Sequence, residues 1–346
     1  MIENKEFQTT INSIYRSRYA EGRKNSLEHF FKGCPYQIYS LGRVAFYFAL
    51  KGLGLKQGDR VLLPSLICKE VLHPVYELGL EPVFFDMDRF LKPVLHADQL
   101  PICKVILCVN YFGFPQDIEY FYNYCRRTGA VLIEDNAQGF LSRDSKKSVL
   151  GMRGNLGIIS FRKTFHLWDG AVLLSPSNSS IFQAMPPDSF PLPPLYKVKT
   201  YLRDKQILST RFIHMLARLK VKVKFVKQAR PEQQDGEIFK IGIRTESLEK
   251  LVAYDWDHEI KRRRALFLYA KDLLKPCGAL PVFEEIEEGT VPYIFPFYIE
   301  NKDFEKVASC LAKYSLQCFS WPDLPPEVRR SAPDYYQKLY GVRFLW

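Results

Sequence analysis

The sequence lacks several features that would place it in a class at once. No apolar run approaches the roughly 18 residues of a membrane-spanning helix. The first 25 residues contain no apolar segment, so we expect no secretory signal. The eight cysteines include no Cys-x-x-Cys pair and lie mostly in apolar runs. That usage is typical of free thiols in a reducing cytoplasm, and it argues against a disulfide framework or a zinc site.

Positive charge is concentrated in one segment. The net charge is +11, and the 34 residues from Lys197 to Arg230 hold eleven Lys and Arg side chains against one acid, Asp204. Three interpretations remain open. The segment is the solvated face of a helix, a surface that attracts anionic lipid or a phosphate-bearing substrate, or a nucleic-acid site. No recognition motif accompanies the charge, so we expect no nucleic-acid partner.

Buried strands and helical patterns alternate through the first half of the chain. The pattern predicts an α/β fold with a mainly parallel sheet covered on both faces. The expected strands are 60–63, 82–86, 104–109, 130–134, 156–161 and 171–174, and the expected helices are 43–51, 69–78 and 117–128.

The pattern changes after a proline-rich stretch at 186–194. Residues 245–274 are predicted to form one long helix whose polar face includes the three arginines at 262–264. A small α+β unit follows, with strands at 291–299 and 316–320 and a helix at 304–314. We therefore expect two domains. Residues 1–240 form an N-terminal arm and a large domain with a basic insertion at about 186–236, and residues 241–346 form a connecting helix and a small domain.

The sharpest local signal is the stretch AlaValLeuIleGluAspAsnAlaGln at 130–138. A buried strand there leads directly into Glu134, Asp135 and Gln138. Ligands of open α/β sheets bind at the carboxyl ends of the strands, so these side chains are site candidates. Asp135 also suits the N-cap of a helix, and the pattern leaves both interpretations open.

Two further signals concern a lysine and a glycine turn. A strand ends at Ser160 and is followed closely by Lys163, which is suited to Schiff base chemistry if it faces a cavity, and is a solvated loop lysine otherwise. Gly42 and Arg43 open a predicted helix, and backbone N–H groups at a helix start bind phosphate. Each signal alone is common.

The motifs taken in order are more specific. The series is GlyArg (42–43), ProSer (64–65), AsnTyrPheGly (110–113), GluAspAsnAlaGln (134–138), SerPheArgLys (160–163), AspGly (169–170) and TrpProAspLeuPro (321–325). It resembles the DegT/DnrJ/EryC1/StrS family of sugar aminotransferases from about Tyr39 to Trp346. The resemblance implies a pyridoxal 5′-phosphate (PLP) enzyme of fold type I, with a large PLP-binding domain built on a mainly parallel mixed sheet and a small C-terminal α+β domain.

The resemblance also implies roles for individual residues. Lys163 would hold PLP as a Schiff base and move protons during catalysis. Asp135 would pair with the pyridinium nitrogen, which makes the ring an electron sink, and Gln138 would lie beside the phenolic oxygen.

The remaining roles concern the phosphate and the face of the ring. Ser160 and the helix start at Gly42 and Arg43 would bind the phosphate. Cys68 stands where the family often has an aromatic residue stacked on the ring.

Besides Cys68, the chain departs from the family pattern in three places. Lys163 follows Ser160 by three residues instead of five, although its distance from Asp169-Gly170 fits the family. Ala171 replaces a second glycine, and the family's closing Leu-Pro…His-Gln segment is missing. His166 lies nearby, and some family members with histidine in place of the lysine are dehydratases.

The expected function is transamination from an amino acid, glutamate in our interpretation, to a keto sugar carried on a nucleotide. Such a reaction serves cell-surface polysaccharide or amino-sugar biosynthesis. The resemblance implies a homodimer with the site at the subunit interface. The cysteine usage predicts a cytoplasmic protein, and we expect no metal. The basic segment at 197–230 would attract the sugar diphosphate or an anionic membrane. The alternatives are a PLP-dependent sugar dehydratase, or a PLP-free relic with a regulatory or scaffold role.

Overall fold

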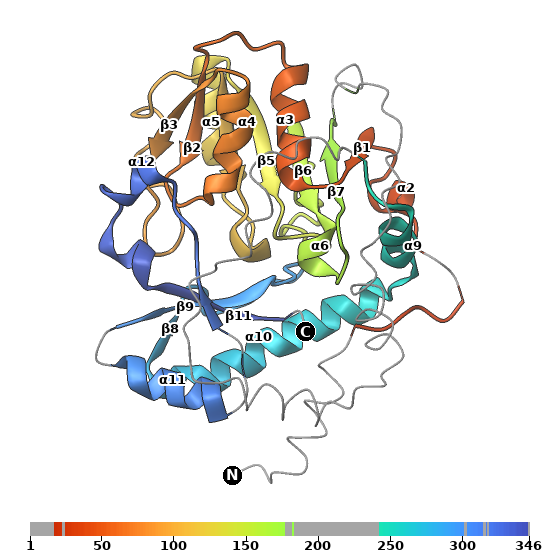
Figure 1. The fold of residues 1–346 in the computed structure, drawn as a ribbon, viewed down its shortest axis with the longest axis vertical. Helices are drawn as coiled ribbons and strands as arrows, with labels where there is room; N and C mark the ends of the chain where they lie inside the picture. Colours follow the sequence, from red (N-terminus) through yellow and green to blue (C-terminus); the bar gives the residue numbers. More distant parts are fainter. Residues whose placement is uncertain are drawn as a thin grey trace.

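The computed structural model describes residues 17–22, 25–176, 182, 242–300, 303–313, 316 and 318–344. The basic segment at 197–230, the proline-rich stretch and the predicted domain boundary at residue 240 lie outside these residues. The described residues form two sheets that Figure 1 shows one above the other, with the long helix α10 running below the larger sheet.

The larger sheet has seven strands in the order β1-β7-β6-β5-β4-β2-β3. Strands β3, β2, β4, β5 and β6 are parallel to one another, and β7 is antiparallel to both of its neighbours. Their bounds are β1 (Tyr36–Tyr39), β2 (Arg60–Pro64), β3 (Glu81–Phe85), β4 (Val105–Val109), β5 (Val131–Asn136), β6 (Leu156–Ser160) and β7 (Ala171–Leu174). Six of these strands are predicted by the sequence within two residues. The predicted α/β class is confirmed.

Helices cover this sheet because its central strands are apolar on both faces. Every residue of β4, β6 and β7 is buried. Helix α3 (Gly42–Gly52) packs on β6 and β7, α4 (Leu72–Glu77) on β3, and α5 (Ile118–Thr128) on β4 and β5. The shorter elements are α2 (Leu27–Phe30), the 3₁₀ turns η1 (Lys69–Val71) and η2 (Tyr111–Gly113), and α6 (Phe161–Thr164).

The prediction of one helix over residues 245–274 is wrong. The structure has α9 (Thr245–Ala253) and α10 (Trp256–Leu274), and the backbone between them is extended at Tyr254 and Asp255. The Asp255 side chain accepts a hydrogen bond from the His258 backbone N–H at 2.9 Å and so caps α10. A local cap thus starts a second helix inside one continuous apolar pattern.

The polar face expected at residues 262–264 is also wrong for two of the three arginines. Arg262 and Arg263 are buried, and both form ion pairs with the buried Glu259 on the same helix. Charged side chains enter protein interiors when they are paired in this way.

The smaller sheet is antiparallel, in the order β10-β11-β9-β8, and lies beside α10 and α11. The predicted strands and helix of this unit are present with shifted ends, whereas β8 and β11 were not predicted. The bounds are η4 (Lys275–Cys277), β8 (Ala279–Pro281), β9 (Ile294–Ile299), α11 (Phe304–Lys313), β10 (Cys318–Ser320), α12 (Pro326–Arg329), η6 (Asp334–Lys338) and β11 (Leu339–Arg343).

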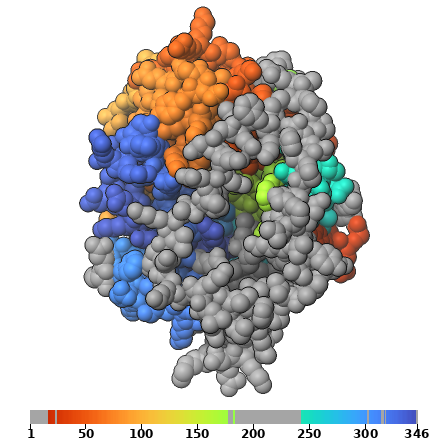
Figure 2. Space-filling view, viewed as in Figure 1, coloured from red at the N-terminus to blue at the C-terminus, as the bar shows by residue number. Residues whose placement is uncertain are grey.

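The C-terminal residues pack directly against the large sheet. Figure 2 shows the blue C-terminal surface in contact with the orange surface of the N-terminal third. The Tyr336 hydroxyl accepts a hydrogen bond from the Met87 N–H at 2.8 Å and lies 3.0 Å from the Ser65 hydroxyl. One hydrophobic core runs through both sheets. Among the helices that the structure describes, none has the length and apolarity needed to cross a bilayer. All eight cysteines are free thiols.

Candidate active site

A small cavity lies beyond the carboxyl ends of β2, β4 and β5. It contains about 320 Å³ of empty space that is partly open to solvent. The lining residues are Leu66, Ile67, Cys68, Val109, Asn110, Asp135, Ala137, Gln138, Lys163 and Trp321. Four predicted site residues therefore line one cavity, at the sheet edge where ligands of α/β folds bind: Cys68, Asp135, Gln138 and Lys163.

Asp135 belongs to the end of β5, and this position excludes the helix N-cap interpretation. Its carboxylate accepts a hydrogen bond from the Ala137 N–H at 2.8 Å. Desolvation by the surrounding protein raises the pKa of Asp135, and the nearby Lys163 ammonium partly offsets that rise. A carboxylate in this environment is stabilised by a cation that enters the cavity.

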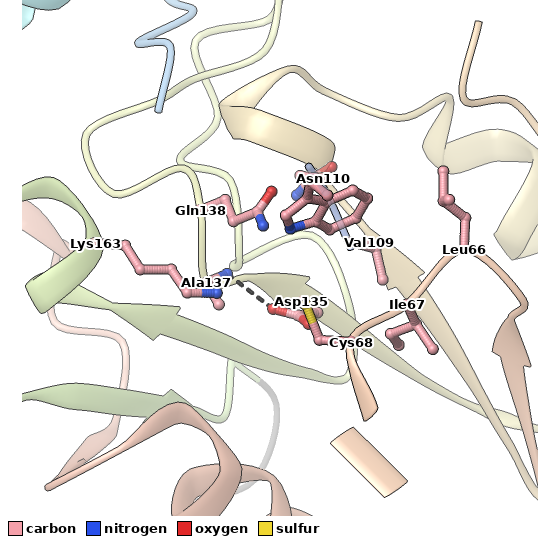
Figure 3. Close-up of a pocket in the computed structure, with 10 residues that line it drawn as sticks. Leu66, Ile67, Cys68, Val109, Asn110, Asp135, Ala137, Gln138 and Lys163 are labelled. Atoms are coloured by element: carbon pink, nitrogen blue, oxygen red, sulfur yellow. Dashed lines mark hydrogen bonds between the residues drawn. The ribbon is translucent and has the colours of Figure 1, made fainter. Parts of the chain in front are cut away.

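Lys163 approaches the cavity from the opposite wall. It belongs to α6, a single helical turn that follows β6 directly. In Figure 3 its side chain extends from α6 toward Ala137 and Asp135. The two flanking phenylalanines, Phe161 and Phe165, are fully buried and fix the turn in the core. The cavity therefore has an amine on one side and a carboxylate on the other.

Gln138 is held in place by the backbone across the cavity. Its side-chain oxygen accepts a hydrogen bond from the Phe112 N–H at 2.8 Å. Phe112 has φ 58° within the turn η2, a backbone conformation that costs a non-glycine residue energy. The amide group of Gln138 faces the interior of the site in Figure 3.

Gly42, Arg43 and Ser160 do not line this cavity, but the sheet brings them to one place. Ser160 ends β6 and pairs with Ala171, which pairs in turn with Tyr39 at the end of β1. Helix α3 begins at Gly42, three residues after Tyr39, and has no side-chain cap. The first N–H groups of a helix have no partner within the helix, so this corner offers donors for an anion.

Sequence reasoning missed several residues of the site. Asn110 lies within the quoted AsnTyrPheGly motif and Trp321 within TrpProAspLeuPro, but neither was assigned a role. The ring of Trp321 packs edge-on against Tyr111 and Phe112, with ring centroids 5.7 and 4.9 Å away. Residues 275–344, which we call the C-terminal unit, thus supply one wall of the cavity.

Glu134, next to Asp135, does not line the cavity but orients a residue that does, Asn110. Its carboxylate accepts hydrogen bonds from Asn110 Nδ2 at 2.7 Å and Arg153 Nε at 2.8 Å, and it is fully buried. Asn110 therefore reaches the cavity already oriented by an ion pair. Within the described parts of the chain, no group of three His, Cys, Asp or Glu side chains is placed to hold a metal ion.

Residues 38–177 match the sequence pattern of the DegT/DnrJ/EryC1/StrS aminotransferase family. The resemblance to this family is confirmed. All seven predicted site residues lie in the matched region, and Trp321 lies outside it. Their individual roles stay predictions.

The family is also represented among similar proteins. GDP-perosamine synthase of Escherichia coli O157:H7 is 30% identical to the chain over 142 residues, which are 39% of each protein. The chain thus matches about two fifths of that relative's length.

Solved structures extend the likeness of the fold to the whole chain. A DegT DnrJ EryC1 StrS aminotransferase from Brucella abortus has a TM-score of 0.59 at 16% identity, covering 98% of this chain and 92% of its own. The Escherichia coli GDP-4-keto-6-deoxy-D-mannose-3-dehydratase with bound hydrated PLP has a TM-score of 0.60 at 17% identity, covering 99% and 92%. The fold predicted from the resemblance is confirmed.

Proposed function

We propose that the protein is a PLP-dependent aminotransferase that moves an amino group from an amino acid to a nucleotide-linked keto sugar. The observation that carries the proposal is the placement of Lys163 and Asp135 on one cavity at the carboxyl end of the sheet. The family match over residues 38–177 and the sugar-nucleotide relatives support the substrate class.

The residues of the cavity fit PLP. Bound PLP supplies an aldehyde that condenses with amines and a ring that accepts electrons from the substrate carbon. An amine at Lys163 suits the aldehyde, and the carboxylate of Asp135 suits a protonated ring nitrogen. The walls formed by Ile67, Val109 and Trp321 suit an aromatic ring, and the helix start at Gly42 suits its phosphate.

Each residue of the site would have its own role in the reaction. Lys163 Nζ would hold the cofactor covalently and, once an amino donor displaces it, would move the proton from the donor's α-carbon to the C4′ carbon of the cofactor. Asp135 would keep a proton on the ring nitrogen. Gln138 would donate to the phenolic oxygen, Ser160 and the amides of Gly42 and Arg43 would hold the phosphate, and Cys68 would cover the ring. We propose glutamate as the donor.

A sugar dehydratase is the second candidate, because a PLP-bound sugar dehydratase shares this fold. Both reactions use the same cofactor, but they need different residues for proton transfer. The side chain facing the cavity from α6 is Lys163, whose amine suits transamination. A PLP-free scaffold role is the third.

An absorbance experiment distinguishes the aminotransferase, the dehydratase and the PLP-free scaffold. Wild-type protein mixed with PLP should develop a yellow band that borohydride bleaches and that Lys163→Ala abolishes. Glutamate should then shift the band toward the pyridoxamine form. A band that no amino donor shifts would favour the dehydratase, and the absence of any band would favour the scaffold role.

We further propose a cytoplasmic homodimer whose basic segment at 197–230 attracts the sugar diphosphate or an anionic membrane. The positive charge of this segment and the free thiols support the proposal. Neutralising Lys220, Lys222 and Lys224 should raise the substrate KM or weaken binding to anionic liposomes. If neither changes, the segment has neither role. Light scattering of the purified protein tests the dimer.

A further inference from the structure

We propose that Arg263 is a positioning residue that holds the turn carrying Lys163 against the cavity. The inference rests on the proposed function of Lys163 and assigns a role to an arginine remote from it in sequence. Arg263 lies on α10, and only 1% of its surface is exposed. Each of its three guanidinium nitrogens makes hydrogen bonds.

One nitrogen of Arg263 binds the end of α6. Nη2 donates to the Thr164 carbonyl and reaches the Lys163 carbonyl at 3.5 Å. Helix α6 has only four residues, so its last carbonyls have no partner within the helix. A helix of a single turn is not stable alone. The guanidinium of Arg263 supplies the missing hydrogen-bond donor to the carbonyls of Thr164 and of Lys163, the residue that carries the amine.

The second nitrogen of Arg263 connects this turn to the opposite wall of the cavity. Nη1 donates to the carbonyls of Pro292 and Tyr293 at 3.2 and 3.0 Å. The Tyr293 N–H in turn donates to the Phe112 carbonyl at 2.8 Å, and the Phe112 N–H binds Gln138. One planar group therefore fixes the distance between the Lys163 turn and the turn that holds Gln138.

The third nitrogen anchors Arg263 on its own helix. Nε donates to Glu259 Oε1 at 2.7 Å, and Glu259 Oε2 accepts a hydrogen bond from Ser17 at 2.8 Å. A lysine at 263 could keep the contact with Glu259. It could not reach the Thr164 carbonyl and the Tyr293 carbonyl together, because it lacks the rigid fork of a guanidinium.

The competing explanation is that Arg263 serves stability alone. Arg262 offers a matched control for this. It is buried on the same helix and donates to the same Glu259 Oε1 at 2.8 Å, but its other terminal nitrogen binds the Phe344 carbonyl near the C-terminus, far in sequence from α6. Arg262→Lys should therefore disturb stability without displacing Lys163.

The experiment compares Arg263→Lys, Arg262→Lys and the wild type. Hydrogen exchange of residues 161–165, measured on protein without PLP, should be at least about tenfold faster in Arg263→Lys and within about twofold of wild type in Arg262→Lys. Capture of PLP by Lys163, trapped with borohydride and located by peptide mass, should slow by at least about tenfold in Arg263→Lys alone. With glutamate as donor, kcat should fall while KM stays within about twofold.

The outcomes are distinguishable. Equal exchange and equal capture in the two variants would overturn the positioning role and leave the proposed function intact. If wild type captures no PLP at Lys163, the proposed function fails, and the exchange data still decide whether Arg263 holds the turn. If Arg263→Lys does not fold, Arg263→Met, in which Glu259 keeps its ion pair with Arg262, is measured with the same expected and contrary results.

Discussion

Two neighbouring carboxylates at the end of β5 have different tasks because their surroundings differ. Glu134 is fully buried and compensated by the guanidinium of Arg153, whose nearest nitrogen lies 2.6 Å away. Asp135 lines the cavity. Burial raises the pKa of Asp135, and Lys163 and the Ala137 N–H offset part of that rise. Strand periodicity explains the division, because consecutive side chains point to opposite faces of the sheet.

The raised pKa of Asp135 gives a prediction with a definite sign. The folded protein binds this proton more tightly than the unfolded chain, so ionising Asp135 reduces stability as the pH rises from about 4 through the folded-state pKa. Asp135→Asn removes that cost. The PLP-free variant should therefore be as stable as wild type or more stable at pH 7, with no gain at pH 3, while its affinity for PLP should fall by at least about tenfold.

Urea unfolding at the two pH values and a PLP titration measure both effects. Asp272→Asn is the control, because the exposed Asp272 on α10 lies outside this cavity, and the substitution should leave PLP affinity unchanged. A clear loss of stability in Asp135→Asn at pH 7 would contradict the prediction.

The site depends on how the ends of neighbouring strands are connected. Glu134 on β5 binds Asn110, which follows β4, and Arg153, which precedes β6. Arg153 Nη2 also donates to Asn110 Oδ1 at 3.0 Å. One buried ion pair thus fixes the carboxyl end of β4 beside β5 and orients Asn110 toward the cavity.

Removing one partner of this ion pair should be costly. Glu134→Ala removes the nearer counter-charge of the buried Arg153, whose second carboxylate partner, Asp144, lies 3.5 Å away, and should lower the free energy of unfolding by about 3 kcal/mol. Glu119→Ala, which breaks the exposed pair with Arg126 on α5, should cost less than about 1 kcal/mol. Urea unfolding of both variants tests the contrast, and equal losses would refute it.

The sequence predicts elements best where their signal is local. The apolar strands β4 and β6 are each a continuous run of buried residues, and the N-cap Asp117 marks the start of α5. Strand β1 has a mixed pattern and becomes a strand by pairing with β7 at the sheet edge. Strand β11 likewise pairs with β9 and β10, and its own residues do not predict that pairing.

The same distinction holds for the site. Asp135 lies at the end of a buried strand and Lys163 shortly after another, and their motifs are continuous in sequence, so both could be identified. Trp321 and Arg263 act on the cavity from segments more than 90 residues away from either. Their contribution depends on how the C-terminal unit docks, and local patterns carry no information about docking.

The two sheets share one core, and the cavity lies where the C-terminal unit meets the large sheet. Trp321 comes from this unit and packs against both aromatic residues of η2. The Lys69 N–H binds the Asp323 carbonyl at 3.0 Å, just after the segment with Cys68 on the other side of the cavity. Docking of the C-terminal unit therefore closes the site.

Trp321 provides the test of this closure. Trp321→Ala removes a wall of the cavity and a large buried side chain, so it should lower the free energy of unfolding by about 3–5 kcal/mol. It should also weaken PLP binding by about tenfold or more, because the ring loses an aromatic surface that excludes water. Trp321→Phe keeps an aromatic ring and should lose less than about half of either effect. Urea unfolding and PLP titration measure both quantities. If Trp321→Ala loses the expected stability but binds PLP as wild type does, the C-terminal unit stabilises the fold without forming the site.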